Sequence, residues 1–597
     1  MFVYHKNPHI IFPRSSILIL TSKYGLSIRQ MIYLFVGLMI SASVFLWRLY
    51  AFGDLEPRGD HAFAAWWIKG LVSADHFLPN QEVGESLFDA MARDEAGILT
   101  QILRPIYNSP TELFKIISVL TVFTITKLIG DAYSIQLAIS LIASAAIPFV
   151  LISFPFWRKA TFNDTAYYWV GISALILAAL SSYMHYFSGW GFHNYGILSL
   201  LFAVAVSTRV FTNITETTAR QNNWRGFLIL LIVNGISLYS YKTNLFLLPP
   251  ATAIAILFLP KLNWQIKLKY LFIYSAIIFL LLLPFIPLVF ISMNKPDYAQ
   301  DMTSPVNLMF ADLSGNLLEW PKIIYERTLN WLSIGQKLYS LPGLAAGTIG
   351  LIVLARNGII LPFCIIVAHY LAWCFVPIFA GVAFRTYPYL IPFLALGAAY
   401  FIISAFKSTL NLPLNNKVLA LIASGLLLAH ISTQIPELRS KTHMKNSLPE
   451  FWASYYTGQG ELRPVISEIE KILPTNATLL TWGYGLKFLY RDLKTNDLDV
   501  DLPALNALML RQNVGLLKSH IKKRHLAFPS KAPIYILVDH EIDHINRQTL
   551  RLKVSALLGP NGFSISENAD IENIAMWQLK SSWPRNVTLY KVVLKGP

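Results

Sequence analysis

Charged residues are scarce in this sequence, and long apolar runs take their place. Only 14% of the 597 residues are Asp, Glu, Lys or Arg, whereas 54% are hydrophobic and the mean hydropathy is +0.48. A soluble protein of this length carries about a quarter charged residues, so the composition excludes an ordinary soluble enzyme. The sequence predicts a polytopic α-helical membrane protein.

Cysteine is nearly absent. Cys364 and Cys374 both lie in one apolar run, ten residues apart. Along a helix that separation is about 15 Å, which is too far for a disulfide within the same helix. We therefore expect two small buried thiols, and the cysteine-free C-terminal region has no disulfide framework.

The formal charge of +16 has an explanation that does not involve nucleic acid. Lys and Arg fall mostly between the apolar runs, where they orient a membrane protein, so no nucleic-acid partner is expected. Lys6, Arg14, Lys23 and Arg29 precede the first run, and no small-residue cleavage site follows it. We expect residues 1–30 in the cytoplasm and 31–52 as an uncleaved signal anchor.

The apolar runs predict about eleven transmembrane helices. They lie near 31–52, 133–156, 166–187, 196–210, 226–241, 245–260, 270–293, 338–355, 358–379, 387–406 and 418–435. A further run at 113–129 is short and is flanked by Glu112, Lys115 and Lys127, which favours an interfacial or re-entrant helix.

The positive-inside rule tests this assignment. With the N-terminus inside, the cytoplasmic connections hold the basic clusters, which are Arg158, Lys159, Arg209, Arg220, Arg225, Lys261, Lys267, Lys269, Arg356, Lys407 and Lys417. The short outer connections hold almost none, Lys242 and Arg385 being the exceptions. The transmembrane domain is thus 31–435, with extracytoplasmic loops at 53–132 and 294–337.

The region 436–597 changes character and should lie outside the membrane. It predicts helices at 462–473, 504–523 and 546–558 and strands at 477–482, 533–538 and 574–579. Alternating helices and short apolar strands indicate a compact extracytoplasmic α/β domain.

An acidic segment follows the first apolar run directly. It reads Asp54-Leu-Glu56-Pro-Arg58-Gly-Asp60-His61. Carboxylates at the lip of a membrane helix are costly in lipid, so they should face water, a partner or a substrate. The sequence therefore predicts an active site that opens to the outer side. The alternatives are an N-cap role for Asp60 and ordinary turn positions for Asp54 and Glu56.

Four segments, in this order, resemble one enzyme family. They are 59–69 after the first helix, Arg104-Pro105-Ile106-Tyr107 before an apolar helix, Arg385-Thr386-Tyr387-Pro388 before a Pro-rich span, and 481–484 in the outer domain. Together they resemble the GT-C fold glycosyltransferases, in the branch of protein O-mannosyltransferases and the lipid A aminoarabinose transferase. The chain departs from that family in two respects. Its acidic pair is spread over Asp54, Glu56 and Asp60, and the second outer loop, 188–195, holds His193 and Asn194 where some members carry another carboxylate.

The resemblance implies an inverting transferase that takes a sugar from a polyprenyl-phosphate carrier, for example undecaprenyl phosphate. Asp60 is the expected base, with Asp54 and Glu56 as further catalytic candidates. Positive charge must stabilise the departing phosphate, and outer-face residues supply candidate contacts. The expected substrate-binding residues are Arg385, Lys242, Arg58, Arg104, His193, Asn194 and Tyr387. Snorkelling at the interface is the alternative for Arg385 and Lys242.

No His or Cys spacing predicts a structural metal site. A divalent cation, Mg²⁺ or Mn²⁺, at Asp54, Glu56 and Asp60 is left open, and no other cofactor is implied. The expected partners are the lipid-linked donor, a lipid, glycan or protein acceptor, and membrane lipids. The expected location is a bacterial inner or plasma membrane.

Two other functions stay open on the sequence. A transporter or lipid flippase would need ionisable residues at mid-membrane, of which the spans hold few, His369 being one. A polysaccharide polymerase or ligase would rely on a large outer loop late in the chain. A non-catalytic assembly protein, with Asp60 only as a helix cap, is the remaining possibility.

Overall fold

The computed structural model describes the helical region and four strands of the C-terminal region. The described residues are 28–52, 67–78 without 69, 97–157 without 109 and 131, 165–186, 191–212, 224–288 without 260 and 261, 320–376, 383–406, 416–439, 465, 468, 469, 471–474, 477–482, 533–539, 571–579 and 585–592. All statements below concern these residues.

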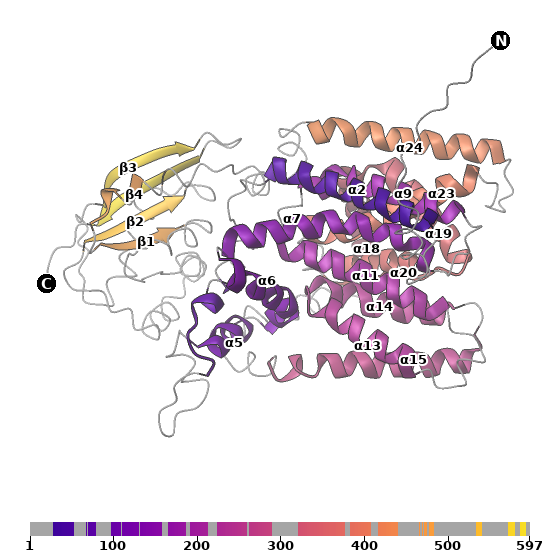
Figure 1. Cartoon of the computed structure of the whole chain (residues 1–597), viewed down its shortest axis with the longest axis horizontal. Coiled ribbons are helices and arrows are strands. Elements are labelled where there is room, and N and C mark those ends of the chain that lie inside the picture. The colour runs from indigo at the N-terminus through magenta and orange to yellow at the C-terminus, as the bar shows by residue number, and fades with distance from the viewer. Residues whose placement is uncertain are drawn as a thin grey trace, which may run out of the picture.

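Apolar helices form most of the described chain. In chain order they are α2 Ile28–Phe52, α5 Ile98–Asn108, η1 Pro110–Lys115, α6 Ile116–Ile129, α7 Ala132–Val150, η2 Leu151–Ser153, α8 Phe154–Trp157, α9 Thr165–Ala179, α10 Ser182–Tyr186, α11 Gly191–Thr212, α13 Trp224–Leu238, α14 Thr243–Leu257, α15 Trp264–Leu282, α18 Trp320–Tyr339, α19 Leu341–Arg356, α20 Leu361–Phe375, α22 Ala383–Thr386, η5 Tyr387–Tyr389, α23 Ile391–Phe406 and α24 Asn416–Arg439. Figure 1 shows α2, α7, α11, α15 and α24 running nearly parallel, with α5, α6 and the sheet at one end.

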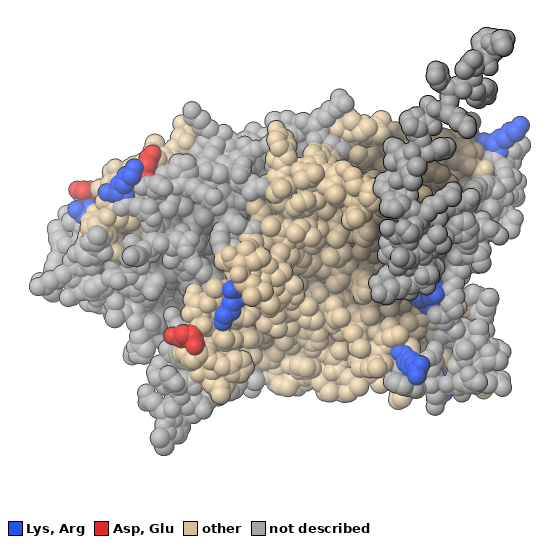
Figure 2. All heavy atoms as spheres, viewed as in Figure 1, with Lys and Arg blue, Asp and Glu red and all other residues tan. Residues whose placement is uncertain are grey.

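The surface supports a membrane-embedded bundle. On the face seen in Figure 2, the described charged atoms lie toward the two ends, and a band without them covers the middle of the helices. Large apolar side chains are exposed along the outer helices, such as Phe35 on α2, Phe272 on α15 and Leu421 on α24. A soluble bundle would turn such faces inward, so these faces suit lipid.

Each predicted span contains a helix, although not all of the helices are long. Six helices of the described chain are long and apolar enough to cross a membrane, or seven if a bent pair counts as one span. α9, α13, α14 and α20 have 15 residues each. The total of eleven spans therefore stays a prediction.

The bent pair is α18 and α19, which meet at 105°. Ser340 between them has a φ of 71°, in the left-handed region that costs energy for a residue with a side chain. Its hydroxyl accepts a hydrogen bond from the Gly343 amide at 3.2 Å and lies 2.9 Å from Nδ1 of His430 on α24. These contacts fix the bend. Helix α18 itself lies largely in the segment 294–337, where the sequence predicted an outer loop.

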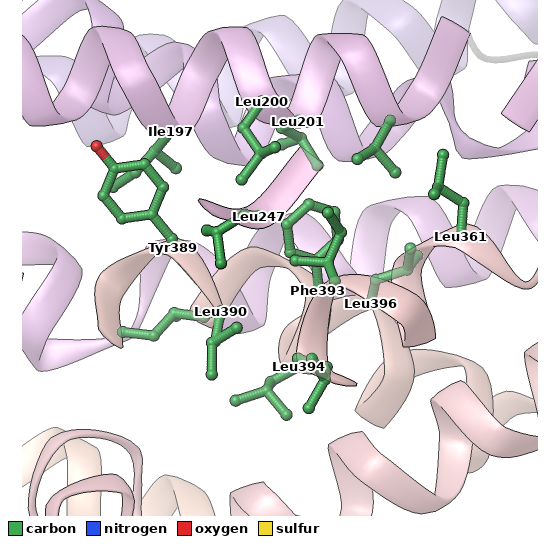
Figure 3. Close-up of a cluster of buried hydrophobic side chains, with 14 of the residues drawn as sticks. Ile197, Leu200, Leu201, Leu247, Leu361, Tyr389, Leu390, Phe393, Leu394 and Leu396 are labelled. Atoms are coloured by element: carbon green, nitrogen blue, oxygen red, sulfur yellow. The ribbon is translucent and has the colours of Figure 1, made fainter. Parts of the chain in front are cut away.

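The core of the bundle lies where α23 crosses its neighbours. A Cβ on Gly350 would collide with the backbone of Gly397, so the absence of a side chain there lets the backbones of α19 and α23 approach closely. Figure 3 shows an apolar layer of this core, in which Phe393 of α23 lies near Leu247 of α14 and Leu200 of α11. The buried thiols of Cys364 and Cys374 are free, as predicted.

A four-stranded sheet forms the described part of the C-terminal region. Its order is β1-β2-β4-β3, with β1 Thr478–Trp482 parallel to β2 Ile534–Asp539, and β4 Arg585–Val592 antiparallel to both β2 and β3 Ile571–Leu579. The strands predicted at 477–482, 533–538 and 574–579 are confirmed, whereas β4 was not predicted. The helices predicted at 504–523 and 546–558 lie outside the described residues.

Candidate functional site

Polar side chains gather at the end of the bundle that faces the sheet. There η1 and the first turn of α6 lie against the turn between α13 and α14. The Ile117 amide donates to the Tyr239 carbonyl at 3.1 Å, and the Ser118 hydroxyl donates to the Ser240 carbonyl at 2.8 Å. The two bonds hold η1 across the ends of the membrane helices.

A buried ion pair lies in η1. In a 3₁₀-helix residues i and i+3 are eclipsed, so Glu112 and Lys115 point to the same side. The Lys115 ammonium is 2.8 Å from Oε1 and 2.7 Å from Oε2 of Glu112. The two side chains are only 10% and 5% exposed, so this is a nearly dry pair.

Aromatic rings surround the lysine. Lys115 Nζ lies 5.8 Å from the centre of the Phe192 ring and 5.7 Å from that of Tyr241, both within the range of cation–π attraction. The Tyr241 hydroxyl is 2.8 Å from Nε2 of His193, and the Tyr389 ring lies 6.4 Å from that of Tyr241. We call Glu112, Lys115, Phe192, His193, Tyr241 and Tyr389 the Lys115 cluster.

Asn194 has a different set of contacts from its neighbour His193. Its amide donates to the Ser140 hydroxyl on α7 at 3.1 Å, and the residue is fully buried. The next residue, Tyr195, donates to the Gln136 carbonyl of the same helix at 3.3 Å. These bonds join α11 to α7.

A second polar cluster lies between α18, α20 and η5. The Trp331 indole donates to Nδ1 of His369 at 3.1 Å, and the Tyr387 ring lies 5.8 Å from Trp331 and 5.7 Å from His369. The Tyr387 hydroxyl is buried and has no hydrogen-bond partner among the described residues. We call Trp331, His369 and Tyr387 the Tyr387 cluster.

The short helix η5 connects the two clusters. Tyr389 packs near His193 and Tyr241, while Tyr387, two residues earlier, packs against Trp331 and His369. Figure 3 shows the Tyr389 ring beside Ile197 of α11. Arg385, half-buried in α22, lies two residues before the start of η5.

The sequence-predicted residues are only partly described. Lys242 follows Tyr241 at the start of α14 and is half-buried. Arg104 belongs to α5, and its side chain lies outside the described residues, as do Asp54, Glu56, Arg58 and Asp60. The structure brings His193 together with the tyrosine that precedes Lys242. It places Tyr387 in the neighbouring cluster, with Arg385 two residues earlier in the chain.

Three further residues were not predicted as site candidates. Glu112 and Lys115 were recognised only as flanking charges, although opposite charges three residues apart before an apolar run are a visible signal. Arg48 is fully buried within α2, and its guanidinium donates to the Ser144 carbonyl at 2.6 Å. Its two other nitrogens have no hydrogen-bond partner in the described structure. An arginine inside an apolar run was the signal.

Among the described residues no group of three His, Cys, Asp or Glu side chains is placed to hold a metal ion. The cation site left open at Asp54, Glu56 and Asp60 lies outside them.

Comparisons with known proteins found similar structures only. No protein-family model matches the chain, and no curated protein matches it. The structure is similar to that of ArnT from Cupriavidus metallidurans in the apo state, with 13% identity over 89% of this chain and 97% of that chain and a TM-score of 0.39. For ArnT bound to undecaprenyl phosphate the values are 12%, 88%, 96% and 0.37. At such values the assignment of a function depends on this chain's own residues.

Proposed function

We propose that this protein is a membrane glycosyltransferase that moves a sugar from a polyprenyl-phosphate donor to an acceptor hydroxyl on the extracytoplasmic side. The Lys115 cluster is the observation that carries this proposal. A lipid-linked phosphate must place its charge at the edge of the membrane while its chain stays in lipid. A buried lysine with aromatic walls at the end of an apolar bundle suits such a group.

The reaction needs a base and a site for the leaving phosphate. In the proposed step Asp60 takes the proton of the acceptor hydroxyl, whose oxygen bonds to the anomeric carbon. The bond from that carbon to the phosphate oxygen breaks, and its electron pair leaves with polyprenyl phosphate. Attack opposite the leaving group inverts the anomeric centre.

Five residues of the described structure have proposed roles in addition to the base. Arg385 and Lys242 supply positive charge to the phosphate, and Tyr387 lines its approach. His193, bonded to Tyr241, contacts the sugar, while Asn194 fixes α11 against α7 beneath it. A sugar offers hydroxyls and apolar ring faces, which match a histidine among aromatic rings.

The acidic segment with Asp54, Glu56 and Asp60 follows the C-terminal end of α2 in the sequence. Helix α2 ends at Phe52, two residues before Asp54, and Figure 1 shows that α5, α6 and the sheet lie at one end of the helices. The proposed active site therefore lies at this end, with the C-terminal region outside the membrane as an aid to acceptor binding.

One observation favours a second candidate, a transporter or flippase of a lipid-linked substrate. Arg48 is a fully buried cation within a membrane helix, which is a feature of transport pathways. A transporter moves the labelled lipid across the bilayer without breaking its sugar bond, so analysis of the products separates the two functions.

The experiment is sugar transfer from a radiolabelled polyprenyl-phosphate sugar in membranes, with an extract of the source cells as acceptor. Asp60→Asn should lower transfer at least about a hundredfold, the contribution of a general base. Asp75→Asn is the matched control, because Asp75 is an exposed acid of the same loop. Folding is checked by chromatography in detergent. If Asp60→Asn retains full transfer, Asp60 is not the base, and a wild type that consumes no donor contradicts the proposed function.

A further inference from the structure

The two members of the Glu112–Lys115 pair differ in the number of groups that they contact. Lys115 lies over the rings of Phe192 and Tyr241 as well as beside the carboxylate. Glu112 receives a hydrogen bond only from Lys115 in the described structure. If the pair opens, the ammonium keeps its aromatic surroundings, whereas the carboxylate loses its one partner.

A buried ion pair of this kind is a weak source of stability. Removing two charges from water costs free energy that their attraction only partly returns, and replacing such pairs by apolar residues is often neutral or stabilising. Stability alone therefore gives no reason for a nearly dry pair in a six-residue 3₁₀-helix. The pair requires another explanation.

The surroundings of Lys115 suit an anion other than Glu112. The Tyr241 ring that faces Lys115 carries a hydroxyl group 2.8 Å from Nε2 of His193. Lys242 follows Tyr241 in the chain. A phosphodiester carries one negative charge, as a carboxylate does. Exchange of one for the other leaves the net charge of the buried site unchanged, which avoids the cost of an uncompensated ion.

We propose that Lys115 is a phosphate ligand and that Glu112 occupies its place when no donor is bound. The donor phosphate displaces the carboxylate and takes over the contact with Lys115. After transfer the product is a phosphate monoester, whose charge at neutral pH is about −1.5 to −2. The added charge strengthens both the attraction of the product to Lys115 and its repulsion from Glu112. The carboxylate returns to Lys115 when the product leaves. This inference rests on the proposed function.

Binding of undecaprenyl phosphate to the full-length protein in detergent tests the exchange. Glu112→Gln removes the competing charge but keeps the size of the side chain, so we expect a Kd about tenfold lower. Lys115→Met removes the ligand, and we expect a Kd at least about tenfold higher. Lys127→Met is the control: Lys127 also lies over a ring, that of Phe123, at 5.7 Å, but it is exposed and distant in sequence from η1.

The double variant Glu112→Lys/Lys115→Glu separates ligand binding from folding. It restores an ion pair, so its melting temperature should lie close to that of the wild type, but it moves the ammonium to position 112. A purely structural pair predicts that binding returns with stability. The exchange predicts that stability returns and binding does not.

Two failures remain distinguishable. A wild type that binds no undecaprenyl phosphate overturns the proposed function together with this inference. A wild type that binds it, with Glu112→Gln no tighter and Lys115→Met no weaker, overturns only the exchange and leaves the transferase proposal in place.

Discussion

The Lys115 cluster and the Tyr387 cluster share the short helix η5 but differ in charge. Both combine a buried histidine with aromatic rings, and η5 contributes Tyr389 to one and Tyr387 to the other. The Lys115 cluster contains a full positive and a full negative charge. In the Tyr387 cluster the described contacts among Trp331, His369 and Tyr387 are a neutral hydrogen bond and ring packing.

The difference indicates separate roles. Charged groups in a dry site hold or exchange ions, since their free energy depends strongly on the partner. A neutral cluster keeps a shape and responds mainly to changes in volume. We therefore expect the Lys115 cluster to determine the affinity for phosphate. The Tyr387 cluster, although Tyr387 lines the approach in the proposed function, should mainly determine how η5 and α18 are positioned.

The largest expected effects come from one added methyl group in each cluster. A Cβ on Gly196 would lie 2.6 Å from Cβ of Tyr241, and one on Gly335 would collide with the Tyr387 hydroxyl. Each alanine variant should lose about 1–3 kcal/mol of stability. Gly196→Ala should also lose most undecaprenyl phosphate binding, whereas Gly335→Ala should keep it. Melting temperature and Kd measured on both variants check the expectation, and equal loss of binding in the two would contradict it.

A pair of Tyr→Phe variants, one in each cluster, should differ from each other in their effect on stability. Tyr241→Phe deprives His193 of a partner at 2.8 Å, and we expect a loss of about 1–3 kcal/mol and a fall in transfer. Tyr387→Phe removes a buried hydroxyl without a hydrogen-bond partner, so stability should change by less than about 0.5 kcal/mol or rise.

Transfer kinetics then show whether the Tyr387 hydroxyl contacts substrate. A lower kcat/KM at unchanged stability would place it there. Equal destabilisation of the two variants would remove the distinction between the clusters.

The smallest expected effect on undecaprenyl phosphate binding is that of Trp331→Phe. This change keeps most of the ring but loses the hydrogen bond to His369, which is worth about 1 kcal/mol. The melting temperature should fall slightly, and the Kd for undecaprenyl phosphate should stay at the wild-type value. A change in Kd larger than the change in stability would show that the neutral cluster also binds the phosphate.

The sequence predicts the positions of the apolar helices well, because a long apolar run in a membrane can satisfy its backbone hydrogen bonds as a helix. It predicts α18 less well: Lys322, Glu326 and Lys337 interrupt its apolar residues, so 320–339 has no continuous run. His193 was expected in a connection, but it lies in the first turn of α11, where its Nε2 is 2.8 Å from the Tyr241 hydroxyl. Strand β4 was missed because its alternation is weak, with Arg585, Asn586 and Lys591 among its residues.

The candidate site was harder to predict than the fold. The pairing of Glu112 with Lys115 needs a 3₁₀-helix, and the rings around Lys115 come from residues far away in sequence, Phe192 and Tyr241. Only the chain's path in space brings these groups together. Conversely, the acidic segment that was most visible in the sequence lies outside the described residues.

The short helices have a consequence for the lipid around the protein. A helix of 15 residues, as in α9, α13, α14 and α20, rises about 22 Å, while the hydrocarbon layer of a bilayer is about 30 Å thick. If one end of such a helix is level with one headgroup layer, its other end lies inside the acyl region. Thinning of the bilayer at that end is one way to accommodate the mismatch. For the proposed transferase, donor and acceptor would then meet closer to the mid-plane of the membrane than they would in an undisturbed bilayer.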